Sequence, residues 1–347
     1  MRRAALVGIA VTLLFPALRP ALGQPTPSTL ARIRTAGVLR CGIDIEQAEY
    51  STADDYGNRA AFDADLCRAV AVAIFGSRAQ VAVKPYPDDA GAMAALKSGE
   101  VDLLPTLTDD FSHAAGKPFR FTRPVLWDGV GFLVLASSPT IRASQLTKSK
   151  ICFLAETTVE ETVRSWFASM HLDFVPFPFQ EEGEMQAAFA TGNCGTLAGE
   201  RTRLAQTRAA LVQHGLRTRL LPESISNDPL AAVVRDDDLQ WFNVVNWVIE
   251  SLVAAEAYGL TQANVGTMQR GSAHDADPQR RFLLGGSKQI GNALGLDNDW
   301  VARVIAAIGN YGEIYKRDLG VGSPLNLPRG ANSLRRNDGM MQPLPMH

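Results

Sequence analysis

The sequence has little net charge of either sign. Its 34 Lys and Arg residues almost balance 36 Asp and Glu residues and leave a formal charge of −2. This balance excludes a strongly basic nucleic-acid binder, because such a protein carries an excess of positive charge. A hydrophobic content of 46% with 20% charged residues also excludes disordered and collagen-like chains. A folded chain of 347 residues is long enough for two cores, so two lobes are expected.

Long apolar runs are missing as well, apart from one near the start. Two arginines precede the apolar residues 4–18, and the small residues ending at Gly23 fit a signal-peptide cleavage site. The run is shorter than a membrane-spanning helix, and no later stretch reaches about 18 apolar residues. We therefore expect residues 1–23 to be removed and the mature protein to be exported to the periplasm. The alternative, a buried N-terminal helix, is disfavoured by the prolines in and after the run.

Cysteine is scarce, and no cofactor is expected. The four cysteines are Cys41, Cys67, Cys152 and Cys194, without a C-x-x-C motif or a histidine pair at zinc-ligand spacing, which disfavours a metal site. An exported protein favours disulfides over four buried thiols. Four cysteines allow three pairings. Cys41 with Cys67 and Cys152 with Cys194 is the favoured one, because each pair then lies within one expected lobe.

The rest of the pattern alternates strands and helices. In the first half, helices are expected at 28–36, 62–75 and 91–98, and strands at 38–43, 80–86 and 101–104. A similar unit follows, with strands at 150–154, 174–179 and 194–197 and helices at 159–171 and 182–191. Such alternation with short connections predicts an α/β fold with largely parallel sheets covered by helices.

Two apolar segments, 129–135 and 229–234, are candidates for paired strands that carry the chain out of the first lobe and back. A long amphipathic helix is expected at 239–258, followed by short helices and a Pro-rich tail. The expected organisation is a signal peptide at 1–23, lobe 1 at 24–132, lobe 2 at 133–231, a return to lobe 1 at 232–270 and a C-terminal helical extension with a tail at 271–347.

Several motifs occur in a specific order and spacing along nearly the whole mature chain. They include Gly37-Val-Leu-Arg-Cys-Gly42, Leu96-Lys-Ser-Gly-Glu-Val-Asp-Leu103, Asp128-Gly-Val-Gly-Phe132 and Asn310-Tyr-Gly-Glu-Ile314. With them the sequence resembles the periplasmic solute-binding proteins of polar amino-acid ABC transporters, of the long general L-amino-acid type. The resemblance implies a two-lobed type II clamshell, a monomer that closes on a small polar solute, and an inner-membrane ABC permease as partner.

An amino acid held between two lobes needs a cation for its carboxylate and an anion for its ammonium, since buried charges must be paired. The resemblance places His113 where the family has an arginine, and Glu200 where it has the ammonium-binding aspartate. An imidazole lacks the planar guanidinium fork, so we expect carboxylate binding to be weaker or differently arranged. Glu200 keeps the negative charge with one more methylene.

The family's glycine before a Thr pair falls on Glu156, which brings a carboxylate close to backbone N–H groups that would face an anion. The resemblance retains other polar candidates for the solute site. They are Thr106, Thr108, Thr157 and Thr158, with Tyr50 as the aromatic cover. Without the resemblance, such threonines would be interpreted as local backbone caps.

Two other functions remain as alternatives. The same fold includes a cyclohexadienyl dehydratase, and His113, Glu156 and Glu200 could serve as acid and base groups in such an enzyme. However, the sequence has no G-x-S-x-G, H-E-x-x-H or P-loop motif. A sensor or accessory protein with a changed cleft is the second alternative. The acidic residues 181–184 are interpreted as a solvated face.

Overall fold

The computed structural model describes residues 28–44, 57–286 and 290–346. The expected signal peptide and Tyr50 lie outside these residues. None of the helices in the described ranges combines the length and the apolar character needed to cross a membrane.

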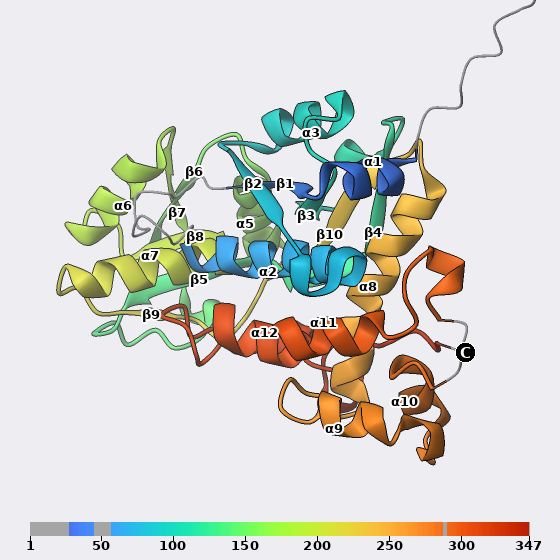
Figure 1. Ribbon diagram of the computed structural model, residues 1–347. Coiled ribbons are helices and arrows are strands. Elements are labelled where there is room, and N and C mark those ends of the chain that lie inside the picture. The colour runs from blue at the N-terminus through green and yellow to red at the C-terminus, as the bar shows by residue number, and fades with distance from the viewer. Residues whose placement is uncertain (1–27, 45–56, 287–289, 347) are drawn as a thin grey trace, which may run out of the picture.

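Two α/β lobes and a helical extension make up the described chain (Figure 1). Lobe 1 starts with α1 (Thr29–Ala36), β1 (Leu39–Asp44), α2 (Gly57–Phe75), β2 (Val81–Tyr86), α3 (Asp89–Ser98), β3 (Leu104–Thr108), α4 (Phe111–Ala114) and β4 (Phe119–Asp128). Lobe 2 contains β5 (Val130–Leu135), β6 (Lys150–Leu154), α5 (Thr158–Ser169), β7 (Val175–Phe179), α6 (Glu182–Ala190), β8 (Thr196–Glu200), α7 (Arg201–Gln213) and β9 (Thr218–Leu220). The chain returns to lobe 1 with β10 (Asp228–Arg235) and α8 (Leu239–Ala257). The extension adds α9 (Val265–Arg270), α10 (Pro278–Leu283), α11 (Trp300–Ile308) and α12 (Tyr311–Asp318).

Both lobes arrange their strands in the same order. In lobe 2 the order is β7-β6-β8-β5-β9. In lobe 1, β1 pairs with β2, and β10 lies between β3 and β4. A parallel bridge between Cys41 and Leu103 joins these two pieces, which gives β2-β1-β3-β10-β4. The first three strands are parallel in each lobe and the fourth is antiparallel to its neighbours. The expected two-lobed α/β fold is therefore confirmed.

The strands that link the lobes differ from the prediction. Segments 129–135 and 229–234 do form strands, but β5 pairs with β8 and β9 whereas β10 pairs with β3 and β4. Each supplies the fourth strand of its own sheet, so the prediction that they pair with each other is wrong. The first link is Gly129, between β4 and β5. A Cβ atom there would lie 2.2 Å from the carbonyl oxygen of Ser226, which only glycine avoids.

The strand expected at 101–104 begins only at Leu104. The residues before it make a single bridge to β1, and Asp102 is occupied by an ion pair at 2.6 Å with Arg40. The apolar pattern of 101–104 predicted a strand but could not predict that Asp102, between its apolar residues, pairs with Arg40. The first helix follows its signals closely, because the Ser28 side chain accepts from the Ala31 N–H and Gly37 ends the helix at φ 71°.

Lobe 1 and the extension share one hydrophobic core. Leu39 and Phe62 of lobe 1 belong to the same buried cluster as Trp300 and Ile314 of the extension. In Figure 1, α11 and α12 run along α2, and both helices contact it. The extension is thus part of the folded body of lobe 1 rather than an appendage.

Lobe 2 has a separate core on each face of its sheet. Neighbouring residues of β5 point to opposite faces, so Phe132 packs with the cluster around α5, while Leu133 packs with the cluster around α6 and α7. Disulfides link Cys41 with Cys67 and Cys152 with Cys194, as predicted.

The segment after α12 touches both lobes. The Asn332 side chain accepts from the Trp127 N–H at 2.7 Å and donates to the Trp127 carbonyl at 2.8 Å, as a neighbouring strand would. Arg208 on α7 of lobe 2 donates to the carbonyls of Leu325 and Asn326. The extension therefore bridges the boundary between the lobes.

Candidate functional site

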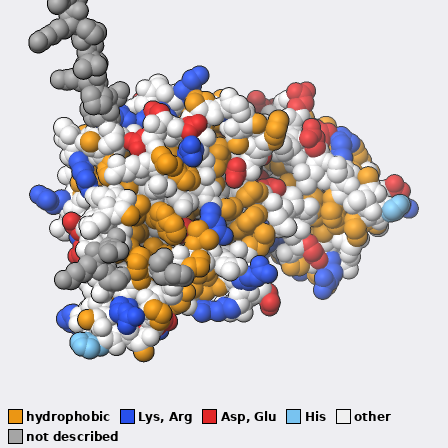
Figure 2. Space-filling model, turned by 90° about the vertical axis from the view of Figure 1, so that its right-hand side faces the viewer, with side chains coloured by type: hydrophobic (Ala, Val, Ile, Leu, Met, Phe, Trp, Pro, Cys, Tyr) orange, Lys and Arg blue, Asp and Glu red, His pale blue; other side chains and the backbone are white. Residues whose placement is uncertain are grey.

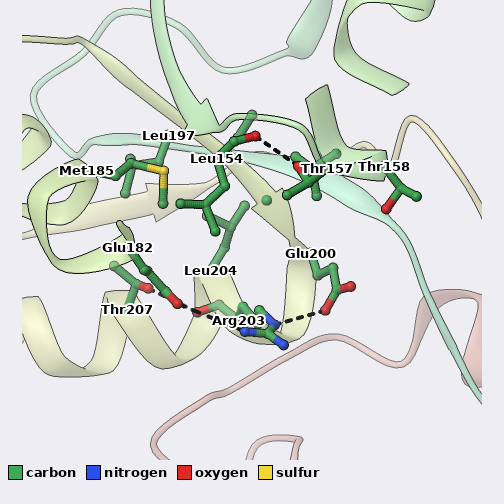
Figure 3. Close-up of a pocket in the computed structure, with 13 residues that line it drawn as sticks. Leu154, Thr157, Thr158, Glu182, Met185, Leu197, Glu200, Arg203, Leu204 and Thr207 are labelled. Carbon is green, nitrogen blue, oxygen red and sulfur yellow. Dashed lines mark hydrogen bonds and ion pairs between the residues drawn. The ribbon is translucent and has the colours of Figure 1, made fainter. Parts of the chain in front are cut away.

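A pocket in lobe 2 lies where α5, α6 and α7 meet the end of β8 (Figure 3). It encloses about 240 Å³. Its lining residues are Leu154, Thr157, Thr158, Val159, Glu182, Met185, Leu197, Ala198, Gly199, Glu200, Arg203, Leu204 and Thr207. Three of the residues predicted from the sequence, Thr157, Thr158 and Glu200, are therefore brought together in one cavity.

The two threonines start helix α5. Thr157 is its N-cap, and its hydroxyl donates to the Leu154 carbonyl at 2.8 Å and accepts from the Glu160 N–H at 3.4 Å. The hydroxyl of Thr157 thus has the local role that a capping residue is expected to have. Thr158 follows it and is exposed.

A row of charged side chains forms one side of the pocket. Arg203 Nε lies 3.2 Å from a carboxylate oxygen of Glu200, and its Nη1 lies 3.9 Å from Glu182. Figure 3 shows the guanidinium between the two carboxylates. All three side chains are only partly exposed, at 34% for Glu200, 27% for Arg203 and 25% for Glu182. Water screens such a row less than it screens a surface pair.

The opposite side of the pocket is apolar. Met185, Leu197 and Leu204 are buried, and Leu154 joins them at the end of β6. The four side chains come from two strands and two helices, which lie far apart in the sequence. The pocket therefore offers both a hydrocarbon surface and charged groups.

The start of α5 carries its own anion. Glu156 has φ 59°, in the left-handed region that favours glycine. Its N–H donates to the Glu160 carboxylate at 2.9 Å, and Arg164 donates to the same carboxylate at 2.8 Å. These hydrogen bonds lower the pKa of Glu160, and the one from the Glu156 N–H has the largest effect. The first turn of α5 thus carries an anion of its own, where the helix dipole favours one.

The predicted lobe 1 residues take part in local interactions. Thr106 is buried, and its hydroxyl lies 2.9 Å from each carboxylate oxygen of the buried Asp63. Thr108 is the last residue of β3 and pairs with Leu230 of β10. These two threonines lie at the end of one strand but do not line the lobe 2 pocket.

His113 lies on the short helix α4 among carboxylates. Its Nδ1 is 3.0 Å from Asp110 and its Nε2 is 3.8 Å from Asp89. Burial opposes ionisation of Asp110, but hydrogen bonds from Ser112 and from the His113 N–H outweigh it and lower the pKa of that carboxyl. The position predicted to replace an arginine is thus in acidic surroundings.

The pattern of the bacterial extracellular solute-binding proteins, family 3, matches residues 39–264. The chain belongs to this family. The match covers both lobes and ends just before α9, so the extension lies beyond it.

Long relatives of this solute-binding protein cover the extension too. The general L-amino acid-binding periplasmic protein AapJ of Rhizobium johnstonii is 36% identical over 92% of this chain and 93% of its own length. The glutamate/glutamine/aspartate/asparagine-binding protein BztA of Rhodobacter capsulatus is 34% identical over 93% of this chain and 94% of its own. Both are named as binding proteins rather than enzymes, which supports a non-enzymatic role.

A solved structure matches along almost the same length. The periplasmic binding protein from Brucella ovis with glutathione bound has a TM-score of 0.76 and 34% identity, and covers 92% of this chain and 99% of that one. An ancestral cationic amino acid solute-binding protein, at 20% identity and a TM-score of 0.50, shows the likeness of fold alone. The expected family of ABC-transporter binding proteins is confirmed.

Several pocket residues of this solute-binding protein were not predicted from the sequence. Glu182 was interpreted as part of a solvated face, yet it lines the pocket at 25% exposure. Arg203, Leu204 and Thr207 follow Glu200 at spacings of three, four and seven residues. That spacing places them on one face of a helix. Had a helix been predicted from Glu200 onwards, its spacing would have placed these three residues beside Glu200.

Two other cavities are present among the described residues. One of about 230 Å³ is lined by Trp247, Phe282, Ile290, Ala293, Leu294, Trp300, Pro345 and Met346. Hydrophobic side chains also gather on the face shown in Figure 2.

The second of these cavities, of about 320 Å³, lies beside the end of β4, where the two lobes are linked, and its lining includes Arg201 and Tyr315. Burial raises the pKa of Tyr315 to about 12. Neither cavity contains a predicted solute-binding residue.

Proposed function

We propose that this chain is the exported binding protein of an ABC importer that holds an amino acid or a related small polar solute between its lobes. The observation that carries the proposal is the pocket at the start of α5, which unites Thr157, Thr158 and Glu200. Glu200 would hold the ammonium group, and the threonines would contact the polar end of the solute. The relatives that span the chain, named for L-amino acids and for glutamate and its neighbours, support the same class of solute.

In this proposal the lobe 1 residues Thr106, Thr108 and His113 face the solute when the lobes close, through a hinge motion at the links between β4 and β5 and before β10. Tyr50 remains the predicted cover. Solute that contacts both lobes shifts the population towards the closed form. The closed monomer would then deliver its solute to an inner-membrane permease, after removal of the signal peptide near Gly23.

Thermal unfolding of the mature, oxidised protein tests the proposal. Solutes would be offered one at a time from a panel of L-amino acids, amines, small peptides such as glutathione, and organic acids. A solute at about 100 times its Kd stabilises the folded form by about 2.7 kcal/mol, which raises the Tm by several degrees. Loss of that shift in Glu200→Ala, with the fold intact by circular dichroism, is the expected result. A panel without any shift would refute the proposal.

A further inference from the structure

Helix α7 has one face on the solute pocket and another on the extension. The residues of α7 and its N-cap that line the pocket are Glu200, Arg203, Leu204 and Thr207. Residues 201, 205 and 208 follow one another at spacings of four and three, which groups them on a different face of the helix. Ala205 is buried in the core that lobe 1 shares with the extension, and Arg201 lines the second cavity together with residues 327–332. The helix thus connects the pocket to the extension.

The start of α7 is fixed at the links between the lobes. The Arg201 N–H donates to the carbonyl of Gly129, the first link, at 3.0 Å. Arg201 Nη1 donates to the carbonyls of Leu221 and Glu223 at 2.8 and 2.9 Å, in the segment that leads to the second link. Arg208 lies seven residues further on, about 10 Å away along the helix axis. A rotation of lobe 2 by about 15° about the links would displace Arg208 by up to about 3 Å, which is more than a hydrogen bond tolerates.

Arg208 bonds to the extension at this position. Its Nη2 donates to the carbonyls of Leu325 and Asn326, the second at 3.3 Å. These partners are neutral oxygen atoms rather than a carboxylate. Burial, with the nearby Arg201 cation second, lowers the pKa of Arg208. The two carbonyl groups therefore solvate a partly buried cation, and separating them from Arg208 costs free energy.

The carbonyls that accept from α7 belong to a segment that lobe 1 holds firmly. We call this segment, residues 325–332, the strap. The Tyr315 hydroxyl of α12 donates to the Pro328 carbonyl at 3.1 Å, and Arg329 forms two bonds of 3.1 Å with the Glu256 carboxylate of α8. At its end the strap bonds to the edge of β4. The strap therefore moves with lobe 1, whereas α7 moves with lobe 2.

The described lining of the solute pocket comes from lobe 2 alone, so lobe 1 is not closed on the pocket in this structure. We propose that Arg208 is a positioning residue that holds the lobes open through the strap and thereby sets the affinity for solute from outside the pocket. Closure separates Arg208 from the two carbonyls, so the solute must supply the free energy of this contact. The inference rests on the proposed function, whose affinity it regulates.

Small-angle X-ray scattering of the ligand-free protein tests the inference without a solute. Arg208→Ala should lower the radius of gyration towards that of the closed form, because the open form loses its contact with the strap. Arg208→Lys can still donate to the carbonyls and should stay closer to the parent. Arg217→Ala is the matched control, since it removes an exposed arginine of lobe 2 that lies outside α7. Its radius of gyration should equal that of the parent.

The affinity for solute is the second measurement. Isothermal titration calorimetry with L-glutamine, L-glutamate and glutathione would give the Kd in the same four proteins. The apparent Kd falls as the fraction of closed protein rises. Arg208→Ala should therefore bind a responding probe up to about tenfold more tightly than the parent does. A merely structural role of Arg208 would lower the Tm of the variant without tightening its binding.

Two results would overturn the inference and leave the proposed function standing. One is an Arg208→Ala protein with the radius of gyration and the Kd of the parent. The other is weaker binding by folded Arg208→Ala, because the contact would then belong to the closed form. If Arg208→Ala does not fold, Arg208→Gln replaces it in both measurements. A parent that binds no probe and shifts in Tm with no member of the wider panel would refute the proposed function, and the scattering alone would still show whether the strap holds the lobes open.

Discussion

The two lobes have the same strand order but use their polar residues differently. In lobe 1, Thr106 is bonded to the buried Asp63, and His113 lies between Asp89 and Asp110. In lobe 2, Thr158 and Glu200 line a cavity. A shared topology thus fixes where the strand ends lie. Which strand end has space for a solute depends on the local partners of each side chain.

The largest expected difference concerns the disulfides. Cys152 and Cys194 are 42 residues apart, and Cys41 and Cys67 are 26 apart. Replacing either pair by serine should lower the free energy of unfolding by roughly 3–4 kcal/mol on loop entropy alone. Most of the lobe 2 core lies in two clusters of its own, and only Ala205 of α7 is buried in the cluster that lobe 1 shares with the extension, so the Cys152–Cys194 variant should unfold in two steps.

Urea unfolding followed by circular dichroism and tryptophan fluorescence would measure both losses. Reduction of the unchanged protein should reproduce their combined effect. Two variants with the stability of the parent would show that the bridges do not constrain the unfolded chain.

The next difference concerns the two threonines. Thr106→Val removes a hydrogen bond to a buried carboxylate, and such a bond contributes about 1.5–3 kcal/mol. Thr158→Val changes an exposed side chain and should alter stability by less than about 0.5 kcal/mol. Urea unfolding of both variants checks the contrast. Equal losses of stability in the two variants would mean that the Thr106 hydroxyl contributes no more to the fold than the Thr158 hydroxyl.

The sequence predicted the elements better than the use of their polar groups. Apolar spacing and glycine stops located the helices at 28–36 and 91–98, which end at Gly37 and Gly99 in the structure. The pairing of β5 and β10 was mispredicted, since apolar runs of similar length do not reveal which sheet they join. Glu182 looked solvated because nothing near it in the sequence indicates Arg203, which folding brings from the next helix.

A further comparison concerns the contact between lobe 1 and the extension, where a buried carboxyl makes the stability depend on pH. Asp318 on α12 is 5% exposed, and Arg317 beside it forms an ion pair with Asp65 on α2. Burial, with the Asp65 carboxylate second, raises the pKa of Asp318 to about 7 from an ordinary value of 3.8. The folded chain therefore binds more protons than the unfolded one between these values. Asp318 thus contributes stability that is complete below pH 4 and is lost as the pH rises through 7.

Asp318→Asn should reduce the slope of the free energy of unfolding against pH by an amount that corresponds to up to one bound proton. Urea unfolding at pH 4.5, 6 and 7.5 measures it, with the exposed Asp297→Asn as the control. An unchanged slope in Asp318→Asn would contradict the raised pKa.

The smallest effect sharpens the comparison at the start of α5. Glu156 is exposed and has φ 59°, a conformation that costs a residue with a side chain roughly 1–2 kcal/mol. Glycine avoids that cost, but it makes the unfolded chain more flexible, which lowers the free energy of unfolding by about 0.4–1 kcal/mol. The net effect of Glu156→Gly should therefore be to stabilise the protein by about 0.5–1 kcal/mol. Glu161→Gly, inside α5, should instead destabilise it by about 1 kcal/mol. Thermal unfolding of both variants measures the signs. A Glu156→Gly protein that melts below the parent would show that the Glu156 side chain stabilises this turn by more than its backbone conformation costs.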